Sequence, residues 1–389
     1  MPRGYKKAKT ASTARPARQF RFDESLALFQ YMLSLFGCQT LDTLCEGMKD
    51  ETWEGWDEQN ISRYYYFLTT RLFEYPGITK EQLLRYDQNI TSHTMAISGR
   101  RGAFRWKYFQ YMALLFSEIY LDKYFNDPQG LLDGLNAQVT LLNSEREAAD
   151  KLPPYVLDDL NKVAFWQATG SGKTLIMHVN ILQYRYYLEK AGKHATLNRV
   201  ILLTPNEGLS EQHNGEFKLS SMPADIFNKE SGSLYAGQEI SIIDIHKLKE
   251  EGKEKTVSVD AFESNNLVLV DEGHRGAGGE EWMDKRNRLC SEGFSFEYSA
   301  TFGQAMKASG KKEMLHLYAK CILFDYSYKY FYGDGYGKEY SILNLAEEQH
   351  EEQRQLYLTA CLLAFYQQLK VYDGKKRELV PFNVEEPLW

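Results

Sequence analysis

The chain has 389 residues, 43% of them hydrophobic and 25% charged, with a formal net charge of -7 at pH 7. Such a composition is typical of a soluble globular protein with a sizeable core and room for two or more domains. It excludes a membrane-spanning protein, because no apolar run reaches the length that crosses a bilayer, and we expect no membrane partner.

The number and spacing of the cysteines indicate whether the protein has disulfides or a zinc site. The five cysteines are scattered, odd in number and without CxxC spacing, at positions Cys38, Cys45, Cys290, Cys321 and Cys361. This pattern argues against a disulfide framework and against a zinc site. Because the N-terminus also has no apolar segment typical of a secretion signal, we predict a cytoplasmic protein.

The N-terminal part divides into a basic tail and a helical region. Residues 1–21 carry seven Lys or Arg side chains and no acid, in a setting too polar to bury a core. We interpret them as a disordered tail that either contacts nucleic acid or is simply solvated. Residues 22–98 repeat apolar and aromatic side chains at intervals of three and four, which predicts an all-helical accessory domain.

A basic, glycine-broken link at residues 99–107 follows, with Arg and Lys interleaved with Phe104 and Trp106. The basic side chains of this link could contact phosphates and its aromatic rings could stack on bases. Alternatively, the link is an ordinary solvated surface. It leads into a predicted amphipathic helix from Tyr108 to Tyr124, and then into a loop with a short helix over residues 126–150.

From residue 163 onward, continuous apolar runs alternate with helical or loop stretches. Continuous runs are what strands buried on both faces of a parallel sheet require. The fold class is therefore α/β. The predicted strands are Val163–Ala168, Val200–Leu203, Ile240–Ile245, Leu267–Val270, Phe294–Tyr298 and Cys321–Phe324.

The first predicted strand runs into a phosphate-binding loop, Gln167-Ala168-Thr169-Gly170-Ser171-Gly172-Lys173-Thr174. Glycines at 170 and 172 let backbone N–H groups turn inward around a polyphosphate at a helix N-terminus. In this arrangement Lys173 reaches the β- and γ-phosphates of ATP, and the Thr174 hydroxyl binds Mg²⁺. The alternative is an ordinary Gly-rich loop, and the pattern departs from the usual phosphate loop by having Gln in place of its first Gly.

A second motif follows about a hundred residues later, where an apolar strand ends in Asp271 and Glu272. Both carboxylates then lie at the carboxyl edge of the sheet, where ligands bind in open α/β folds. We expect Asp271 to hold Mg²⁺ through water and Glu272 to orient and deprotonate the attacking water. On its own, an Asp-Glu pair is often only a solvated turn.

Three weaker signals follow other strands. Thr204 is expected to cap a helix with Pro205 in its first turn, whose free N–H groups bind a nucleic-acid phosphate, although plain capping explains the same residues. Ser299 and Thr301 follow a strand and are candidates for coupling the nucleotide site to a nucleic-acid track. His274, directly after the Asp-Glu pair, is a candidate for coupling ATP state to a neighbouring lobe.

Together these motifs resemble motifs I, Ia, II and III of superfamily 2 DExH helicases, most closely the prokaryotic branch that includes the Res subunits of type III restriction enzymes. The resemblance covers about residues 107 to 340. It implies a RecA-like ATPase lobe that uses ATP and Mg²⁺ and moves along nucleic acid, with DNA favoured over RNA. It also implies that Gln110, in Lys107-Tyr108-Phe109-Gln110, reads adenine.

The resemblance further implies a second RecA-like lobe that supplies arginine fingers, in cis or in trans, and a role in bacterial defence with other subunits. A long amphipathic helix over about residues 345–372, turning at Gly374, leads toward that lobe, so we expect a fragment or one part of a split enzyme. The expected organisation is tail 1–21, helical domain 22–98, lobe 99–340 and linker 341–389. An ATP-binding switch or scaffold that does not move along nucleic acid is the alternative function.

Overall fold

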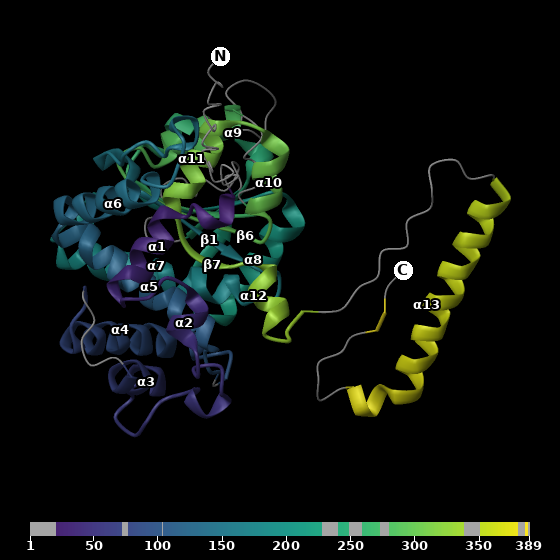
Figure 1. The fold of residues 1–389 in the computed structure, drawn as a ribbon. Coiled ribbons are helices and arrows are strands. Elements are labelled where there is room, and N and C mark those ends of the chain that lie inside the picture. Colours follow the sequence, from purple (N-terminus) through teal and green to yellow (C-terminus); the bar gives the residue numbers. More distant parts are fainter. Residues whose placement is uncertain are drawn as a thin grey trace, which may run out of the picture. The chain divides into compact units, whose positions relative to one another are not determined.

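A parallel sheet of seven strands organises the first part of the protein (Figure 1). The structure is a computed structural model that describes residues 21–71, 77–102, 104–227, 240–248, 259–272, 280–337, 351–379 and 386–387. The order across the sheet is β3-β4-β2-β5-β6-β1-β7, and all neighbouring pairs are parallel. The strands are β1 (Lys162–Gln167), β2 (Arg199–Thr204), β3 (Ala224–Ile226), β4 (Ile240–Asp244), β5 (Asn266–Asp271), β6 (Phe294–Ser299) and β7 (Ile322–Tyr326).

Helices precede the sheet and connect its strands. Those before β1 are α1 (Ala27–Leu35), α2 (Leu41–Cys45), α3 (Arg63–Arg71), α4 (Lys80–Ser98), α5 (Tyr108–Asn126) and α6 (Pro128–Asn143). Those after β1 are α7 (Lys173–Lys190), α8 (Glu207–Leu219), α9 (Glu280–Leu289), α10 (Phe302–Ser309), α11 (Lys312–Cys321), α12 (Tyr328–Gly333) and α13 (Glu351–Leu379). The predicted α/β fold with a parallel sheet after a helical N-terminal region is therefore confirmed.

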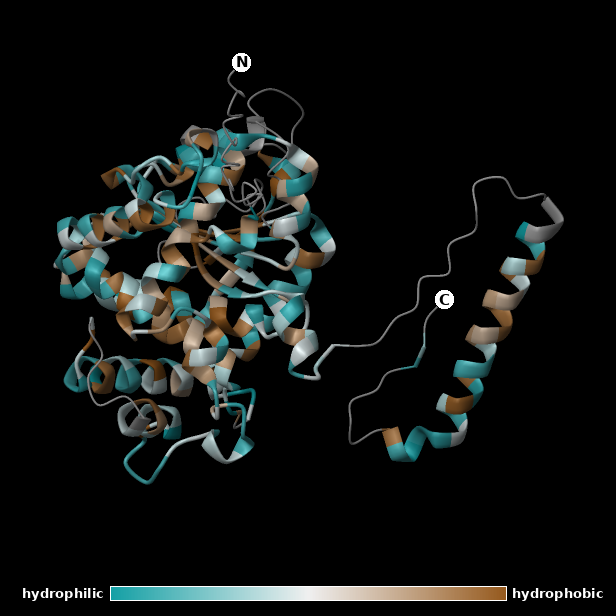
Figure 2. Cartoon of the chain, in the orientation of Figure 1, coloured by the Kyte–Doolittle hydropathy of each residue, from teal (hydrophilic) through white to brown (hydrophobic). Residues whose placement is uncertain are grey.

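The apolar runs explain why these segments become central strands. In β2, Val200 and Leu202 belong to one hydrophobic cluster, whereas Ile201 and Leu203 belong to another. Successive side chains of a strand point to opposite faces, so both faces of the sheet are covered by apolar groups. In Figure 2 hydrophobic stretches of the inner strands lie among helices that carry both hydrophobic and hydrophilic residues.

The predicted strands all form, and the structure adds β3, which the sequence analysis missed. Three helix predictions were wrong. α5 is not amphipathic, because it is buried on nearly every side from Tyr108 to Leu121. The region after it forms the 16-residue helix α6 where a short helix and a loop were expected. α13 continues through Gly374, where a turn was expected.

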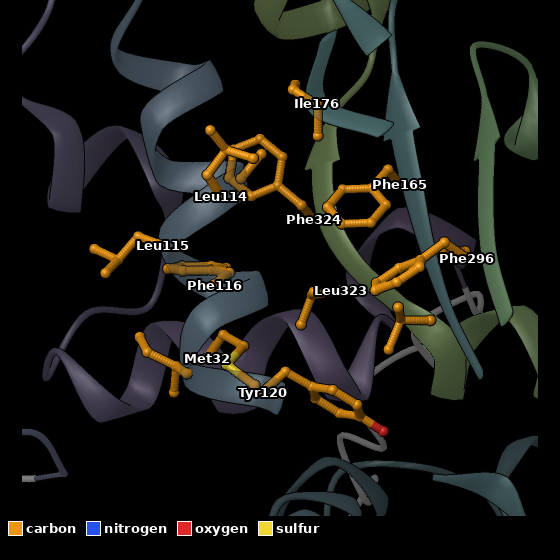
Figure 3. Close-up of a cluster of buried hydrophobic side chains, with 14 of the residues drawn as sticks. Met32, Leu114, Leu115, Phe116, Tyr120, Phe165, Ile176, Phe296, Leu323 and Phe324 are labelled. Atoms are coloured by element: carbon orange, nitrogen blue, oxygen red, sulfur yellow. The ribbon is translucent and has the colours of Figure 1, made fainter. Parts of the chain in front are cut away.

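The N-terminal helices share their hydrophobic core with the sheet. Met32 of α1 and Phe116 of α5 lie in the same buried cluster as Phe324 of β7 (Figure 3). The ring of Phe116 meets that of Phe324 edge-on, with 5.6 Å between their centroids. The core is thus continuous across Ser98, the residue at which the sequence analysis placed a domain boundary.

Two buried ionisable groups stabilise this unit through specific partners. Arg286 of α9 forms an ion pair with Glu297 of β6, and both side chains are fully buried. The other carboxylate oxygen of Glu297 accepts a hydrogen bond of 2.9 Å from the Tyr318 hydroxyl. Further hydrogen bonds offset part of the cost of burying an ion pair, and this network ties α9 and α11 to the sheet.

Glu118 of α5 is a second buried acid and makes stability depend on pH. Burial raises the pKa of Glu118 to about 7, although hydrogen bonds from Tyr187 and Asn89 favour its charged form. A raised pKa in the folded state stabilises the protein at low pH, and this contribution is lost as pH rises toward 7. We therefore expect Glu118→Gln to gain about 2–3 kcal/mol of unfolding free energy relative to wild type between pH 5 and pH 8.

Urea unfolding of both proteins at the two pH values measures this difference. The substitution keeps the size of the side chain and removes only its titration, so wild type serves as the matched control. A difference between the two proteins that does not change with pH would contradict a buried, titrating Glu118.

The second compact unit begins after Gly337 and contains α13. Along this helix, hydrophobic and hydrophilic turns alternate (Figure 2). None of the helices in the described ranges combines the length and the hydrophobicity that crossing a bilayer requires. The predicted tail lies, apart from Arg21, outside the described residues.

Candidate nucleotide-binding site

The loop after β1 has the backbone that a phosphate loop needs. Gly170 and Gly172 adopt φ angles of 84° and 89°, in the left-handed region that favours glycine. A Cβ atom at Gly172 would also lie 2.3 Å from the Gln110 amide nitrogen, so a larger residue would displace the Gln110 side chain as well as strain the backbone. α7 begins directly afterwards at Lys173, which places its free N–H groups at the loop.

Lys173 lies over this loop and within electrostatic reach of the Asp-Glu pair. Its Nζ atom donates to the carbonyl oxygens of Gln167 and Ala168, each at 3.3 Å. Burial lowers the pKa of Lys173, while the nearby carboxylates of Glu272 and Asp271 act in the opposite direction. The structure therefore brings together three of the residues predicted for ATP hydrolysis.

The residues present fit a bound nucleotide and Mg²⁺. Within the described part of the chain, the hydroxyl of Ser171 is buried and has no hydrogen-bond partner, which leaves a donor for a phosphate oxygen. Thr174 lies in the first turn of α7 and Asp271 at the end of β5. Hydroxyl and carboxylate oxygens are the ligands that Mg²⁺ prefers when substrate phosphates complete its shell.

Asp271 and Glu272 follow β5 at the same edge of the sheet as the phosphate loop. Between their strands lies only β6, which pairs with both β5 and β1. Glu272 has a φ angle of 57°, which is unusual for a residue with a side chain. Such strain is typical of functional positions, where the fold holds a side chain in one place.

Gln110 touches the phosphate loop directly. Its Nε2 atom donates to the Ser171 carbonyl oxygen at 2.8 Å, and its Oε1 atom accepts from the Lys107 N–H at 2.9 Å. Each amide atom retains one further bonding position, a donor on Nε2 and an acceptor on Oε1. Adenine reading by Gln110 stays a prediction, and the position of the side chain beside the loop is compatible with it.

The helix after β2 is capped by a different residue from the one predicted. Asn206 is the N-cap of α8, and its side chain accepts from the Leu209 N–H at 2.9 Å. Thr204 is the last residue of β2 and is buried, with its hydroxyl 2.6 Å from that of Ser210. The predicted cap at Thr204 was therefore wrong, and Pro205, expected in the first turn of the helix, precedes the cap. The N-terminus of α8 itself remains exposed at residues 206–208.

Ser299 and Thr301 lie at the end of β6, next to the strand that carries the phosphate loop. Ser299 is fully buried, opposite Trp166 in the β1–β6 register, and its hydroxyl accepts from the Thr301 N–H at 3.1 Å. Thr301 is the N-cap residue of α10. Their coupling role stays a prediction, and His274 lies outside the described residues.

The basic link of residues 99–107 is engaged within the protein. Arg101 binds Glu216 at 2.6 Å and donates to the Ser220 hydroxyl at 2.9 Å, both at the C-terminal end of α8. Trp106 is buried and donates to Thr94 at 2.7 Å, so base stacking on this ring is excluded. Lys107 pairs with Glu54 at 2.8 Å.

His213 of α8 is a site residue that the sequence analysis did not single out. Its Nε2 atom lies 2.9 Å from Oδ2 of Asp271. The sequence carries no signal for this contact, because the two residues are 58 positions apart and meet only in the folded protein.

Asp334, directly after α12, was also missed. It accepts hydrogen bonds from the hydroxyls of Tyr108 and Tyr326, the latter at 2.6 Å, and pairs with Lys49 at 2.5 Å. Phe331 of the same helix lies against the phosphate loop, 3.7 Å from where a Cβ of Gly170 would be. α12 is thus fastened beside the nucleotide site.

A cavity of about 310 Å³ lies elsewhere, at the opposite edge of the sheet. Lys162 at the start of β1 and Cys321 just before β7 line it, together with the ion pair between Lys320 and Asp159. Ligands of open α/β sheets bind at the carboxyl ends of the strands, so we place the nucleotide at the phosphate loop and not in this cavity.

Comparison with known proteins supports the motif-based resemblance. Residues 136–304 match the family described as "Type III restriction enzyme, res subunit", a segment that contains the phosphate loop and the Asp-Glu pair. The predicted resemblance to the Res-subunit branch of superfamily 2 helicases is thereby confirmed. No curated protein matches the chain.

Two solved structures are similar in part. The SWI2/SNF2 ATPase core of Sulfolobus solfataricus in complex with dsDNA is 14% identical, with a TM-score of 0.29, and the match covers 41% of this chain and 32% of that one. The UvsW helicase of bacteriophage T4 is also 14% identical with a TM-score of 0.29, covering 74% of this chain and 94% of that one. The chain thus spans about a third of the length of the SWI2/SNF2 core.

Proposed function

From the Res-subunit match and the geometry of the site, we propose that this chain is the first RecA-like lobe of an ATP-dependent helicase or translocase that acts on DNA. The observation that carries the proposal is the approach of Lys173 to the carboxylates of Asp271 and Glu272 beside a glycine loop of left-handed backbone. Phosphoryl transfer depends on this kind of positioning and charge compensation.

In the proposed reaction each residue has a distinct task. Backbone N–H groups of residues 169–174 bind the phosphates of ATP, and Lys173 compensates the charge on the β- and γ-phosphates. Thr174 and Asp271 hold Mg²⁺, which when bound neutralises charge on the transferred phosphate. Glu272 orients and deprotonates the attacking water. A second RecA-like lobe, in cis or in trans, completes the charge compensation.

The proposed nucleic-acid contacts lie at the same edge of the sheet. The exposed N-terminus of α8 offers N–H groups to a phosphate of the track. Ser299 and Thr301, beside the phosphate-loop strand, relay the nucleotide state. We further propose that the protein acts in the cytoplasm in bacterial defence, together with other subunits.

An ATP-binding switch or scaffold is the second candidate. The observations that favour it are the net charge of -7 and the engagement of Arg101 and Lys107 in ion pairs within the protein. Both reduce the positive surface available to a phosphate backbone. Such a module binds ATP and changes partners without movement along a nucleic acid.

ATP turnover of the intact protein separates the two functions. We expect duplex or single-stranded DNA to stimulate turnover, RNA to stimulate it less, and binding to weaken steeply with salt, each phosphate contact adding about 0.7 to 0.9 to the slope. Turnover without polymer is the control. Equal turnover with every polymer, with ATP binding intact, would favour the switch or scaffold.

A further inference from the structure

We propose that His213 is a positioning residue for the metal-binding carboxylate Asp271, and that through it α8 influences the affinity of the site for its metal ion. The inference rests on the proposed function, because it assumes that Asp271 helps to hold Mg²⁺. It adds a residue from another helix to a site otherwise built from the loops after β1 and β5.

The contact between the two residues is short and screened from water. Nε2 of His213 lies 2.9 Å from Oδ2 of Asp271, and the side chains are only 4% and 13% exposed. An ionised carboxylate only accepts hydrogen bonds, so Nε2–H is the donor. Because water competes little in this setting, the bond fixes the direction of the Asp271 carboxylate, whose Oδ1 atom would then be available to hold the metal ion.

Among the residues that the structure describes, the bond to Asp271 is the one hydrogen bond of the His213 ring. Within the part of the chain that the structure describes, Nδ1 of His213 is buried without a hydrogen-bond partner. An unsatisfied buried nitrogen costs free energy, which a leucine at this position would avoid. We therefore infer that the bond to Asp271 is the reason why this buried position has a histidine.

Contacts elsewhere on α8 hold the helix that carries His213. On the same helix, Phe217 stacks on the ring of His178 at 4.2 Å between centroids, and Ser220, its C-cap residue, lies 2.8 Å from His178 Nδ1. Arg101 ties the end of this helix to the basic link. The helix that carries His213 is thus held from α7 and from the link, independently of Asp271.

This arrangement makes the site sensitive to small movements of α8. A hydrogen bond of 2.9 Å is lost when its atoms separate by less than 1 Å more. The N-terminus of α8 is the proposed contact for a nucleic-acid phosphate, six residues before His213. A ligand that shifts or steadies α8 therefore changes how firmly Asp271 is oriented.

Metal affinity tests the positioning role without relying on catalysis. Hydrogen bonds that orient a metal ligand change metal affinity by about 10- to 100-fold. In the intact protein with a non-hydrolysable ATP analogue, we expect His213→Leu to weaken Mn²⁺ binding about 10-fold, measured by the EPR signal of free Mn²⁺. Affinity for the analogue in EDTA is expected to stay unchanged, and His213→Gln, which keeps an N–H donor, to retain most of the Mn²⁺ affinity.

His93→Leu is the control. It removes another imidazole with a buried Nε2 atom, from α4, where the ring meets that of Tyr186 edge-on at 6.0 Å between centroids. Because Tyr186 lies near the C-terminal end of α7 and not on α8, we expect the Mn²⁺ affinity of this variant to stay at the wild-type value. Equal loss in both variants, or Mn²⁺ binding by His213→Leu as tight as in wild type, would overturn the positioning role.

The proposed coupling between DNA binding at α8 and metal affinity is tested by a separate measurement. Coupling between two sites is reciprocal, so DNA that alters the contact must alter Mn²⁺ affinity. We expect DNA to shift the Mn²⁺ affinity of wild type and to leave that of His213→Leu unchanged. A persistent shift in the variant, or none in wild type, overturns the link, whereas a wild-type protein that binds no nucleotide overturns the proposed function itself.

Discussion

Lys173→Ala is expected to weaken ATP binding by the intact protein about 10- to 100-fold. The side chain lies over the phosphate loop, where its Nζ atom donates to two carbonyl oxygens that a phosphate would replace as partners. A hydrogen bond to a charged group contributes about 1.5–3 kcal/mol, and each 1.4 kcal/mol is a tenfold change in affinity. Titration with a fluorescent ATP analogue measures the loss.

Lys193→Ala provides the matched control for this experiment. Lys193 is an exposed lysine just beyond the C-terminal end of α7, the helix that Lys173 begins. It carries the same charge at the opposite end of the same helix, so its removal should leave the affinity unchanged. Equal affinities of wild type and Lys173→Ala would show that the loop after β1 does not bind the phosphates of ATP.

Glu272→Gln is expected to separate binding from turnover. General base catalysis contributes about 10²- to 10⁴-fold to rate, so turnover should fall at least about 100-fold. Gln has the same shape and the same tolerance of the left-handed backbone, and ATP affinity should therefore stay at the wild-type value. The measurements are DNA-stimulated ATP turnover and analogue binding on the same preparation.

Glu263→Gln is a close control for the Glu272 variant. Glu263 also has a left-handed φ angle, 60°, but it precedes β5 and so lies at the other edge of the sheet. The same chemical change at the same backbone conformation should leave turnover intact. Unchanged turnover in Glu272→Gln would remove this residue from the mechanism.

Much of the fold could be predicted because burial on both faces leaves a simple pattern. Continuous apolar runs mark six of the strands, whereas β3 is a three-residue edge strand whose side chains are only partly buried or exposed. The same logic explains why α5 was misjudged. A helix covered on all sides has no polar face, and it receives that covering only from tertiary neighbours.

The part of the site that consists of residues close together in sequence could be predicted. The phosphate loop and the Asp-Glu pair are local motifs, and the structure brings Lys173 near both carboxylates. His213 and Asp334 could not be found in this way, because their partners come from distant elements. Thr204 was assigned a capping role that Asn206, two residues later, performs.

Asp334 has a mechanical consequence for a protein whose second unit begins a few residues later. A pull on the chain beyond Gly337 would be resisted first by Tyr336, whose ring packs against those of Phe109 and Phe331. Asp334, with Lys49 and two tyrosine hydroxyls, would resist it next. The same short helix holds Phe331 against Gly170. Tension along the chain would therefore enter the first unit at contacts that lie beside the loop after β1, the candidate nucleotide site.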